Sequence, residues 1–234
     1  MKYFKSISIL LIVVVISLLA FRKDPIDLPM DIGEKVKDYA IGHIAGDDEE
    51  YLVVLTEGKS KEYGEEVIVY SLGDGEEIYR KDFSELNPWK LIIGDIDGDL
   101  WDEISIGVYK KSPLHQVMAK RPFIYSFKDG RIVPKWRGSR LSRPFVDYNF
   151  YDIDKDGVDE IISIEFLEDG RNIINTYKWK GFGFEGFLES ESFQVIDKLR
   201  VEDGEVYLQI KDGKDDYIGN LKLIDDNLII ERVE

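Results

Sequence analysis

Two stretches of the sequence, Asp95-Ile-Asp-Gly-Asp-Leu-Trp-Asp-Glu103 and Asp152-Ile-Asp-Lys-Asp-Gly-Val-Asp-Glu160, share one acidic pattern. Each has a carboxylate at its first, third, fifth and ninth positions, and each runs directly into a hydrophobic segment, Ile104–Val108 or Ile161–Phe166. Short segments rich in β-branched residues are typical of strands. The two stretches therefore predict a turn followed by a strand, repeated along the chain.

The same arrangement can be followed, more weakly, at two further places. The strands after the turns are expected to begin near Tyr51, Ile104, Ile161 and Val206, at steps of 53, 57 and 45 residues. A period of about 50 residues with several short strands in each unit is typical of β-propeller blades. We therefore expect an all-β, β-propeller-like domain over residues 36–234, with about four blades of four antiparallel strands. The expected repeats cover residues 36–86, 87–141, 142–190 and 191–234.

Short β-rich segments separated by Gly and Asp turns fill the chain from residue 36 onward, and almost no stretch has the helical period. Asp-Gly pairs at 74–75, 129–130, 169–170 and 203–204 lie between such segments, and this pair is a strong hairpin signal. The best predicted strands are residues 51–55, 67–70, 91–93, 104–108, 123–127, 161–166, 173–179, 206–210 and 228–233.

The acidic pattern has the chemistry of a calcium site. Carboxylates at alternate positions of a tight loop converge on one point, and calcium accepts six to eight oxygens at flexible angles. Crowded carboxylates repel one another without a cation, which couples folding to metal binding. The second loop has Gly157 at its tight sixth position, whereas the first has Leu100, and a non-Gly residue rarely adopts a positive φ. The alternative is an Asp-rich surface turn that binds no metal.

At these residues the sequence resembles the FG-GAP/VCBS repeat family, which includes the propeller blades of integrin α-subunits and many exported bacterial proteins. The resemblance rests on the pattern Asp-x-Asp-x-Asp-Gly-x-x-Asp/Glu before a hydrophobic strand, and it covers residues 89–190 well. In that family the loop joins the first two strands of a blade and binds calcium. Repeats one and four depart from the pattern, so no calcium is expected there. The resemblance implies two calcium sites, one formed by Asp95, Asp97, Asp99, the Trp101 carbonyl and Glu103, the other by Asp152, Asp154, Asp156, the Val158 carbonyl and Glu160.

The N-terminus carries a targeting signal. Residues 3–21 are mostly apolar, just long enough for one membrane crossing, and Arg22-Lys23 follows them. A cleaved signal peptide is the alternative, although Leu18 at the −3 position of a cut after Ala20 is unfavourable. A buried helix of the soluble fold is the third reading. We expect a signal-anchor or signal peptide over residues 1–23, a linker over 24–35, and an extracytoplasmic domain, because calcium loops fill readily at millimolar calcium.

Composition limits the function classes. The net charge of −16 repels nucleic acid and anionic lipid, so neither is an expected general partner. The absence of cysteine excludes disulfides, thiolate zinc sites and a Cys nucleophile. No Ser-His-Asp pattern or Gly-rich phosphate loop marks a catalytic site, and we expect no enzyme activity. The alternative is a cell-envelope enzyme such as a glycan hydrolase, with paired carboxylates and the repeats as scaffold.

Positive charge is concentrated between Tyr109 and Arg143, where ten Lys and Arg residues accompany a single acid. In a propeller the two connections in this segment would lie on one face, opposite the acidic loops. We expect this face to dock an anionic protein or cell-envelope polymer; the alternative is a solvated surface that balances the acidic loops. The first hypothesis is therefore a membrane-tethered binding or scaffold module, and a structural accessory subunit of a membrane complex is a further one. The predicted docking residues are Lys110, Lys111, Lys120, Arg121, Arg137, Arg140 and Arg143.

Overall fold

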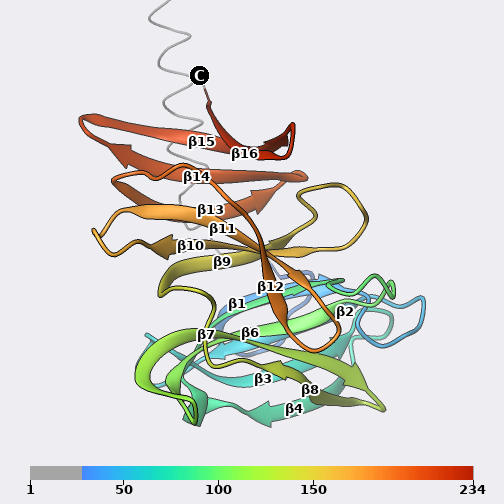
Figure 1. The fold of residues 1–234 in the computed structure, drawn as a ribbon. Helices are drawn as coiled ribbons and strands as arrows, with labels where there is room; N and C mark the ends of the chain where they lie inside the picture. The colour runs from blue at the N-terminus through green and yellow to red at the C-terminus, as the bar shows by residue number, and fades with distance from the viewer. Residues whose placement is uncertain (1–27, 234) are drawn as a thin grey trace, which may run out of the picture.

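The structure, a computed structural model, describes residues 28–233, which form four antiparallel sheets of four strands each (Figure 1). In every sheet the strands pair in chain order, so each sheet is an up-and-down meander. The one helical segment in this part of the chain is a single 3-10 turn, η1 (Ser84–Leu86). The expected all-β fold with four units of four antiparallel strands is confirmed.

The sixteen strands include every segment predicted as a strand, and the additional strands are mainly at the edges of the sheets. Their bounds, sheet by sheet, are β1 (Val36–Gly42), β2 (Tyr51–Glu57), β3 (Gly64–Ser71) and β4 (Glu77–Asp82); β5 (Pro88–Gly94), β6 (Glu103–Ser112), β7 (His115–Lys128) and β8 (Arg131–Arg137); β9 (Phe145–Tyr151), β10 (Glu160–Phe166), β11 (Asn172–Trp179) and β12 (Phe184–Glu189); and β13 (Val195–Glu202), β14 (Glu205–Asp212), β15 (Asp215–Ile224) and β16 (Asn227–Arg232).

Each predicted Asp-Gly pair lies in a turn between two paired strands. Asp129-Gly130, for example, is the two-residue turn between β7 and β8, with φ values of 51° and 68°. Two positive φ angles define the turn type whose twist matches that of the flanking strands. The pair therefore sets the register of the hairpin.

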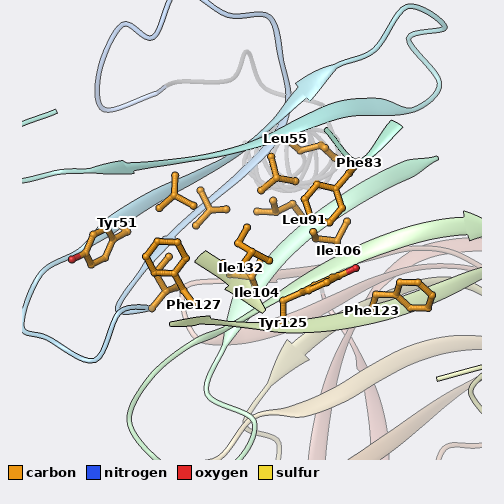
Figure 2. Packing of buried hydrophobic residues seen from close by; sticks show 14 of the residues in the cluster. Tyr51, Leu55, Phe83, Leu91, Ile104, Ile106, Phe123, Tyr125, Phe127 and Ile132 are labelled. Atoms are coloured by element: carbon orange, nitrogen blue, oxygen red, sulfur yellow. The ribbon is translucent and has the colours of Figure 1, made fainter. Parts of the chain in front are cut away.

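The sheets pack face to face in chain order, and a hydrophobic cluster joins each neighbouring pair. Between the first and second sheets, Tyr51 and Leu55 belong to the same cluster as Ile104, Ile106 and Tyr125 (Figure 2). Strand alternation supplies both faces of the inner sheets. In β10, for example, Ile161 faces the second sheet, whereas Ile162 and Ile164 face the fourth.

The outer face of the first sheet is apolar and lies under the segment that precedes it. The buried side chains of this face are Leu52, Val54, Ile68 and Tyr70. Residues 28–35, expected as part of a linker, are thus packed against the sheet. The covering side chains are Leu28, Met30, Ile32 and Val36.

The outer face of the fourth sheet is different, because it is polar. Along β14, Val206, Leu208 and Ile210 are buried toward the third sheet, whereas the alternating Tyr207 and Gln209 are partly exposed. A polar outer face is typical of the terminal unit of a stacked array. Among residues 28–233 no hydrophobic cluster joins the fourth sheet to the first, so the sheets form a series with two unlike ends.

The predicted membrane-spanning stretch, residues 3–21, lies outside the described residues. Within residues 28–233, no helix has the length and apolar character that a membrane crossing requires.

Replacing Leu28, Met30 and Ile32 together with Ser should lower the free energy of unfolding by about 2–4 kcal/mol, because the first sheet loses its apolar cover. Urea unfolding of the full chain in detergent, followed by circular dichroism, measures the loss. The control variant carries Pro29→Ser and Lys35→Ser, which are exposed positions of the same segment. Equal losses in the two variants would show that the segment stabilises nothing by packing.

Candidate metal centre

The two acidic loops occupy the same place in neighbouring sheets. Residues 95–102 join β5 to β6 in the second sheet, and residues 152–159 join β9 to β10 in the third. In each loop the second residue, Ile96 or Ile153, is buried in a hydrophobic cluster. These isoleucines anchor the loops to the core, and the ninth residues, Glu103 and Glu160, begin the following strands.

The first carboxylate of each loop holds the turn in shape. Asp95 accepts hydrogen bonds from three backbone N–H groups of its own loop, at 2.8, 2.8 and 3.3 Å. Asp152 accepts two such bonds, at 3.0 and 3.1 Å. The fifth-position carboxylate accepts the N–H of the seventh residue, Trp101 or Val158, at 3.0 Å in both loops. The two loops therefore share two internal bonds, from the N–H of the sixth residue to the first carboxylate and from the N–H of the seventh residue to the fifth carboxylate.

Carboxylate oxygens converge in both loops, and each loop brings together three of its four predicted carboxylates within 4.8 Å of one another. The first loop does so with positions one, three and five, whereas the second uses positions one, three and nine. Glu103 and Asp156 are the two predicted carboxylate ligands outside these sets. The converging residues are Asp95, Asp97 and Asp99 in the first loop and Asp152, Asp154 and Glu160 in the second.

Lys135, in β8, supplies positive charge to the first loop. Its Nζ lies 2.5 Å from Oδ2 of Asp97 and 2.7 Å from Oε1 of Glu103, whose side chain is almost fully buried. Burial raises the pKa of Glu103 to about 7, and the ion pair with Lys135 opposes that rise. The second oxygen of Glu103, Oε2, has no hydrogen-bond partner in the described part of the chain. The buried carboxylate is thus only half satisfied.

Lys178, in β11, supplies positive charge to the second loop. Its Nζ lies 2.7 Å from oxygens of both Asp154 and Asp156 and 3.2 Å from Oε1 of Glu160, the last contact being an ion pair without hydrogen-bond geometry. Burial raises the pKa of Glu160 to about 7, while the N–H of Ile153 and the Lys178 ammonium oppose the rise. Oδ1 of Asp154 is also buried without a hydrogen-bond partner among residues 28–233.

These orphaned oxygens indicate that a divalent cation fits the loops. A lysine ammonium offers three donors, whereas each acidic stretch holds five carboxylates, four of which are predicted ligands. Buried polar atoms almost always have partners, so Glu103 Oε2, Asp154 Oδ1 and Glu160 Oε1 mark positions where a cation would add bonds. Calcium suits such a set because it accepts many oxygens at flexible angles. The predicted ligands of each loop would hold the calcium ion.

The eighth residue of each loop contacts the preceding sheet, a role that the sequence pattern did not indicate. The N–H of Asp102 donates to the carbonyl of His43 at 2.8 Å, and the N–H of Asp159 donates to the carbonyl of Asp95 at 2.7 Å. Oδ2 of Asp102 also accepts the N–H of His43 at 2.8 Å. Each loop is therefore tied to the end of the first strand in the neighbouring sheet.

Gly42 and Gly94 make this approach possible. A Cβ atom on Gly42 would lie 2.2 Å from Oδ2 of Asp102, and one on Gly94 would lie 2.4 Å from Oδ2 of Asp159, so neither position accepts a larger residue without a shift. In the third sheet the residue at the corresponding position, the end of the first strand, is Tyr151. The neighbouring fourth sheet has a two-residue hairpin turn there and no acidic loop.

Leu100 adopts the left-handed conformation that its position requires. Its φ is 71°, and Gly157 at the same position of the second loop has a φ of 89°. The fourth positions match as well, with φ values of 75° at Gly98 and 60° at Lys155. The first loop thus follows the same backbone path as the second and places a leucine, 78% exposed, in an unfavourable conformation.

The predicted docking residues lie at the end of the sheets opposite the acidic loops, on the β6–β7 hairpin and the connection from β8 to β9. Lys111, Arg137 and Arg140 are exposed and Lys110 is half-buried. No ion pair within residues 28–233 involves these four side chains. These four cations are therefore available at this end of the sheets without an ion-pair partner among the described residues.

Lys120 and Arg143 are held by the fold. The Lys120 ammonium donates to a backbone carbonyl of β9 and lies 4.1 Å from the ring centroid of Trp89. Arg143 pairs with Glu189 at 2.8 Å and with the buried Glu165 at 3.4 Å. Both cations contribute to internal contacts more than to the surface.

Arg121 is fully buried, and its prediction as a docking residue was wrong. Its guanidinium donates to the carbonyls of Lys110, His115 and Val117 at 2.8, 3.2 and 2.9 Å, which closes the base of the β6–β7 hairpin. Desolvation lowers the pKa of Arg121. A side chain with no exposed surface cannot meet a partner.

A scan against models of known protein families and a search of curated proteins both found no match. The function is therefore inferred from the chain's own residues.

The substitution Leu100→Gly should raise the free energy of unfolding by about 1 kcal/mol, because glycine adopts a positive φ without steric cost and the exposed leucine loses few contacts. Chemical denaturation in the absence of added calcium measures the gain. Leu100→Ala is the matched control, since it removes the side chain but keeps the Cβ that causes the strain. A gain in both variants would contradict the backbone explanation.

Proposed function

We propose that this chain is a membrane-tethered, extracytoplasmic calcium-binding protein with a β-propeller-like domain that acts as a binding or scaffold module. The observation that carries the proposal is an acidic loop at the same position in two neighbouring sheets, each with a buried carboxylate oxygen that lacks a partner. Residues 3–21 would provide the tether, and calcium would be available on the extracytoplasmic side.

The propeller-like reading draws on the topology of the sheets. Each sheet is a four-stranded meander, and the sheets pack face to face in chain order. Both acidic loops join the first two strands of their sheets, as in the FG-GAP/VCBS repeats that these residues resemble. The unlike end faces suit an open series of four units better than a closed ring.

Calcium would act here as a structural ion. It would bind the oxygens of the two loops, and because the loops also contact the preceding sheets, an ordered loop would hold neighbouring sheets together. A ligand that binds only the folded state adds stability by mass action. In a chain without cysteine, this contribution replaces the disulfides common in exported domains.

The binding activity would belong to the opposite end of the sheets. Lys111, Arg137 and Arg140 form an exposed cationic group there with Lys110, in a molecule that is otherwise strongly acidic. Charge complementarity favours an anionic protein or cell-envelope polymer as the partner. The exposed Leu114 at the tip of the β6–β7 hairpin, 90% accessible, adds an apolar contact beside these cations.

Calcium should raise the melting temperature of the full chain in detergent relative to the same protein in chelator. At a hundredfold excess over Kd, each site would contribute about 2.7 kcal/mol of stability. Thermal unfolding by circular dichroism in calcium, magnesium and chelator measures the difference. An unchanged melting temperature in chelator would contradict the metal proposal.

The variant Asp154→Asn should lose part of this calcium response because it removes one carboxylate of the second loop. Its control is Asp169→Asn, an exposed Asp of a hairpin turn outside the acidic loops, whose Oδ1 accepts the N–H of Arg171. The control should respond to calcium as the unmodified chain does. A full response in Asp154→Asn would exclude this residue as a ligand.

Reversing the charge of Lys111, Arg137 and Arg140 to Glu should reduce binding to immobilised polyglutamate or polyphosphate by about tenfold or more, because attraction becomes repulsion. Surface plasmon resonance at low and physiological salt measures the change. The control reverses Lys128, Lys155 and Lys180, three cations at the end with the acidic loops. If both variants lost the same amount of binding, the binding would depend on net charge alone, which would contradict the proposed docking surface.

A further inference from the structure

Two lysines reach the acidic loops from different places in their sheets. Lys135 belongs to the fourth strand of the second sheet and Lys178 to the third strand of the third sheet. By strand register, the position of Lys178 corresponds to Ser126, which donates to Glu103 at 3.3 Å. The two ammonium groups thus meet equivalent carboxylates although the lysines do not occupy equivalent positions. A common requirement of the loops for positive charge explains this convergence.

We propose that Lys135 and Lys178 are tethered competitors of the cation at the two acidic loops. Each loop then has two states, one paired with its lysine and one bound to a metal ion, and the lysine sets the calcium concentration at which the loop changes state. The proposal rests on the proposed calcium function and assigns to it two residues that determine affinity.

The lysine-paired state neutralises the loops only in part. In the second loop the Lys178 ammonium contacts Asp154, Asp156 and Glu160, yet Asp154 Oδ1 and Glu160 Oε1 make no hydrogen bond with any described residue. Glu160 is 1% exposed, so solvent does not compensate for the missing bond. A divalent ion brings twice the charge and accepts six to eight oxygens. The lysine therefore occupies the loop but leaves these two buried carboxylate oxygens without hydrogen bonds.

The structure also leaves room for the lysine to withdraw. A cleft of about 510 Å³ lies beside the second loop, lined by Asp156, Glu160, Lys178 and Trp179. Lys178 keeps 20% of its side chain exposed, and its ammonium lies 4.8 Å from the ring centroid of Phe187. Because Lys178 itself lines this cleft, a rotation of its flexible stem can move the ammonium away from the carboxylates and into open space.

The two loops should differ in how strongly the lysine competes. Lys178 contacts three carboxylates, whereas Lys135 contacts two, Asp97 and Glu103. Removal of Lys178 should therefore change the affinity of its loop more than removal of Lys135 changes the other.

Calorimetric titration of calcium into the full chain in detergent tests the proposal. Lys178→Met should bind calcium about tenfold or more tightly than the unmodified chain at one site, and Lys135→Met should show a smaller gain, because a like charge beside the ion is removed. In chelator, the melting temperature of Lys178→Met should fall, and calcium should restore it. Lys178→Gln keeps an uncharged donor at the loop and serves if the methionine variant does not fold.

Lys180→Met is the matched control, because Lys180 lines the same cleft and makes no ion pair with the described residues. Its calcium affinity should stay unchanged. Equal affinity in the unmodified chain and Lys178→Met, or weaker binding in the variant, would overturn the competition while leaving the calcium sites. Absence of calcium binding from the unmodified chain and all variants would overturn both proposals. Binding by the lysine variants alone would support the competition and contradict calcium as the native ion.

Discussion

The acidic end of the molecule depends on the neutralisation of carboxylates that the fold forces together. Glu103 and Glu160 begin the second strands of the two central sheets and are 3% and 1% exposed. Placing an unpaired charge at such a depth is costly, so a positive group must accompany it. In the described structure the charge comes from a lysine of the same sheet. The positions of the two lysines follow from this constraint.

The sheets are held together by apolar contacts between their faces. The alternation of apolar and polar residues along the strands decides whether an outer face needs a cover. The first sheet has apolar residues on both faces and therefore needs the cover provided by residues 28–36. The fourth sheet has one apolar face and one polar face, so it can end the series in water. The difference explains how the four sheets of residues 28–233 can be stable without a hydrophobic cluster between the first and the last.

Much of the fold could be predicted because local chemistry decides it. The Asp-Gly pairs lie in the expected turns, and the isoleucines of segment 161–166 are buried on both faces of the strand that they predicted. The outer strands β4 and β12 were missed because they are largely exposed and carry no apolar alternation. Sequence also identified the acidic loops but not their lysines, since Lys178 approaches Glu160 only through the register of two strands. Arg121 was misjudged because a charged side chain is normally exposed.

The bonds from Asp102 and Asp159 have a consequence for how the molecule responds as a whole. Asp159, in the second loop, donates to the carbonyl of Asp95, which is itself the first carboxylate of the other loop. Asp102 continues the line to His43 in the first sheet. The two loops are therefore parts of one backbone chain of contacts across three sheets. Because the bond between Asp159 and Asp95 joins the two loops directly, any free-energy coupling between them must be equal in both directions. The two acidic loops are therefore one hydrogen-bonded unit rather than a pair of separate sites.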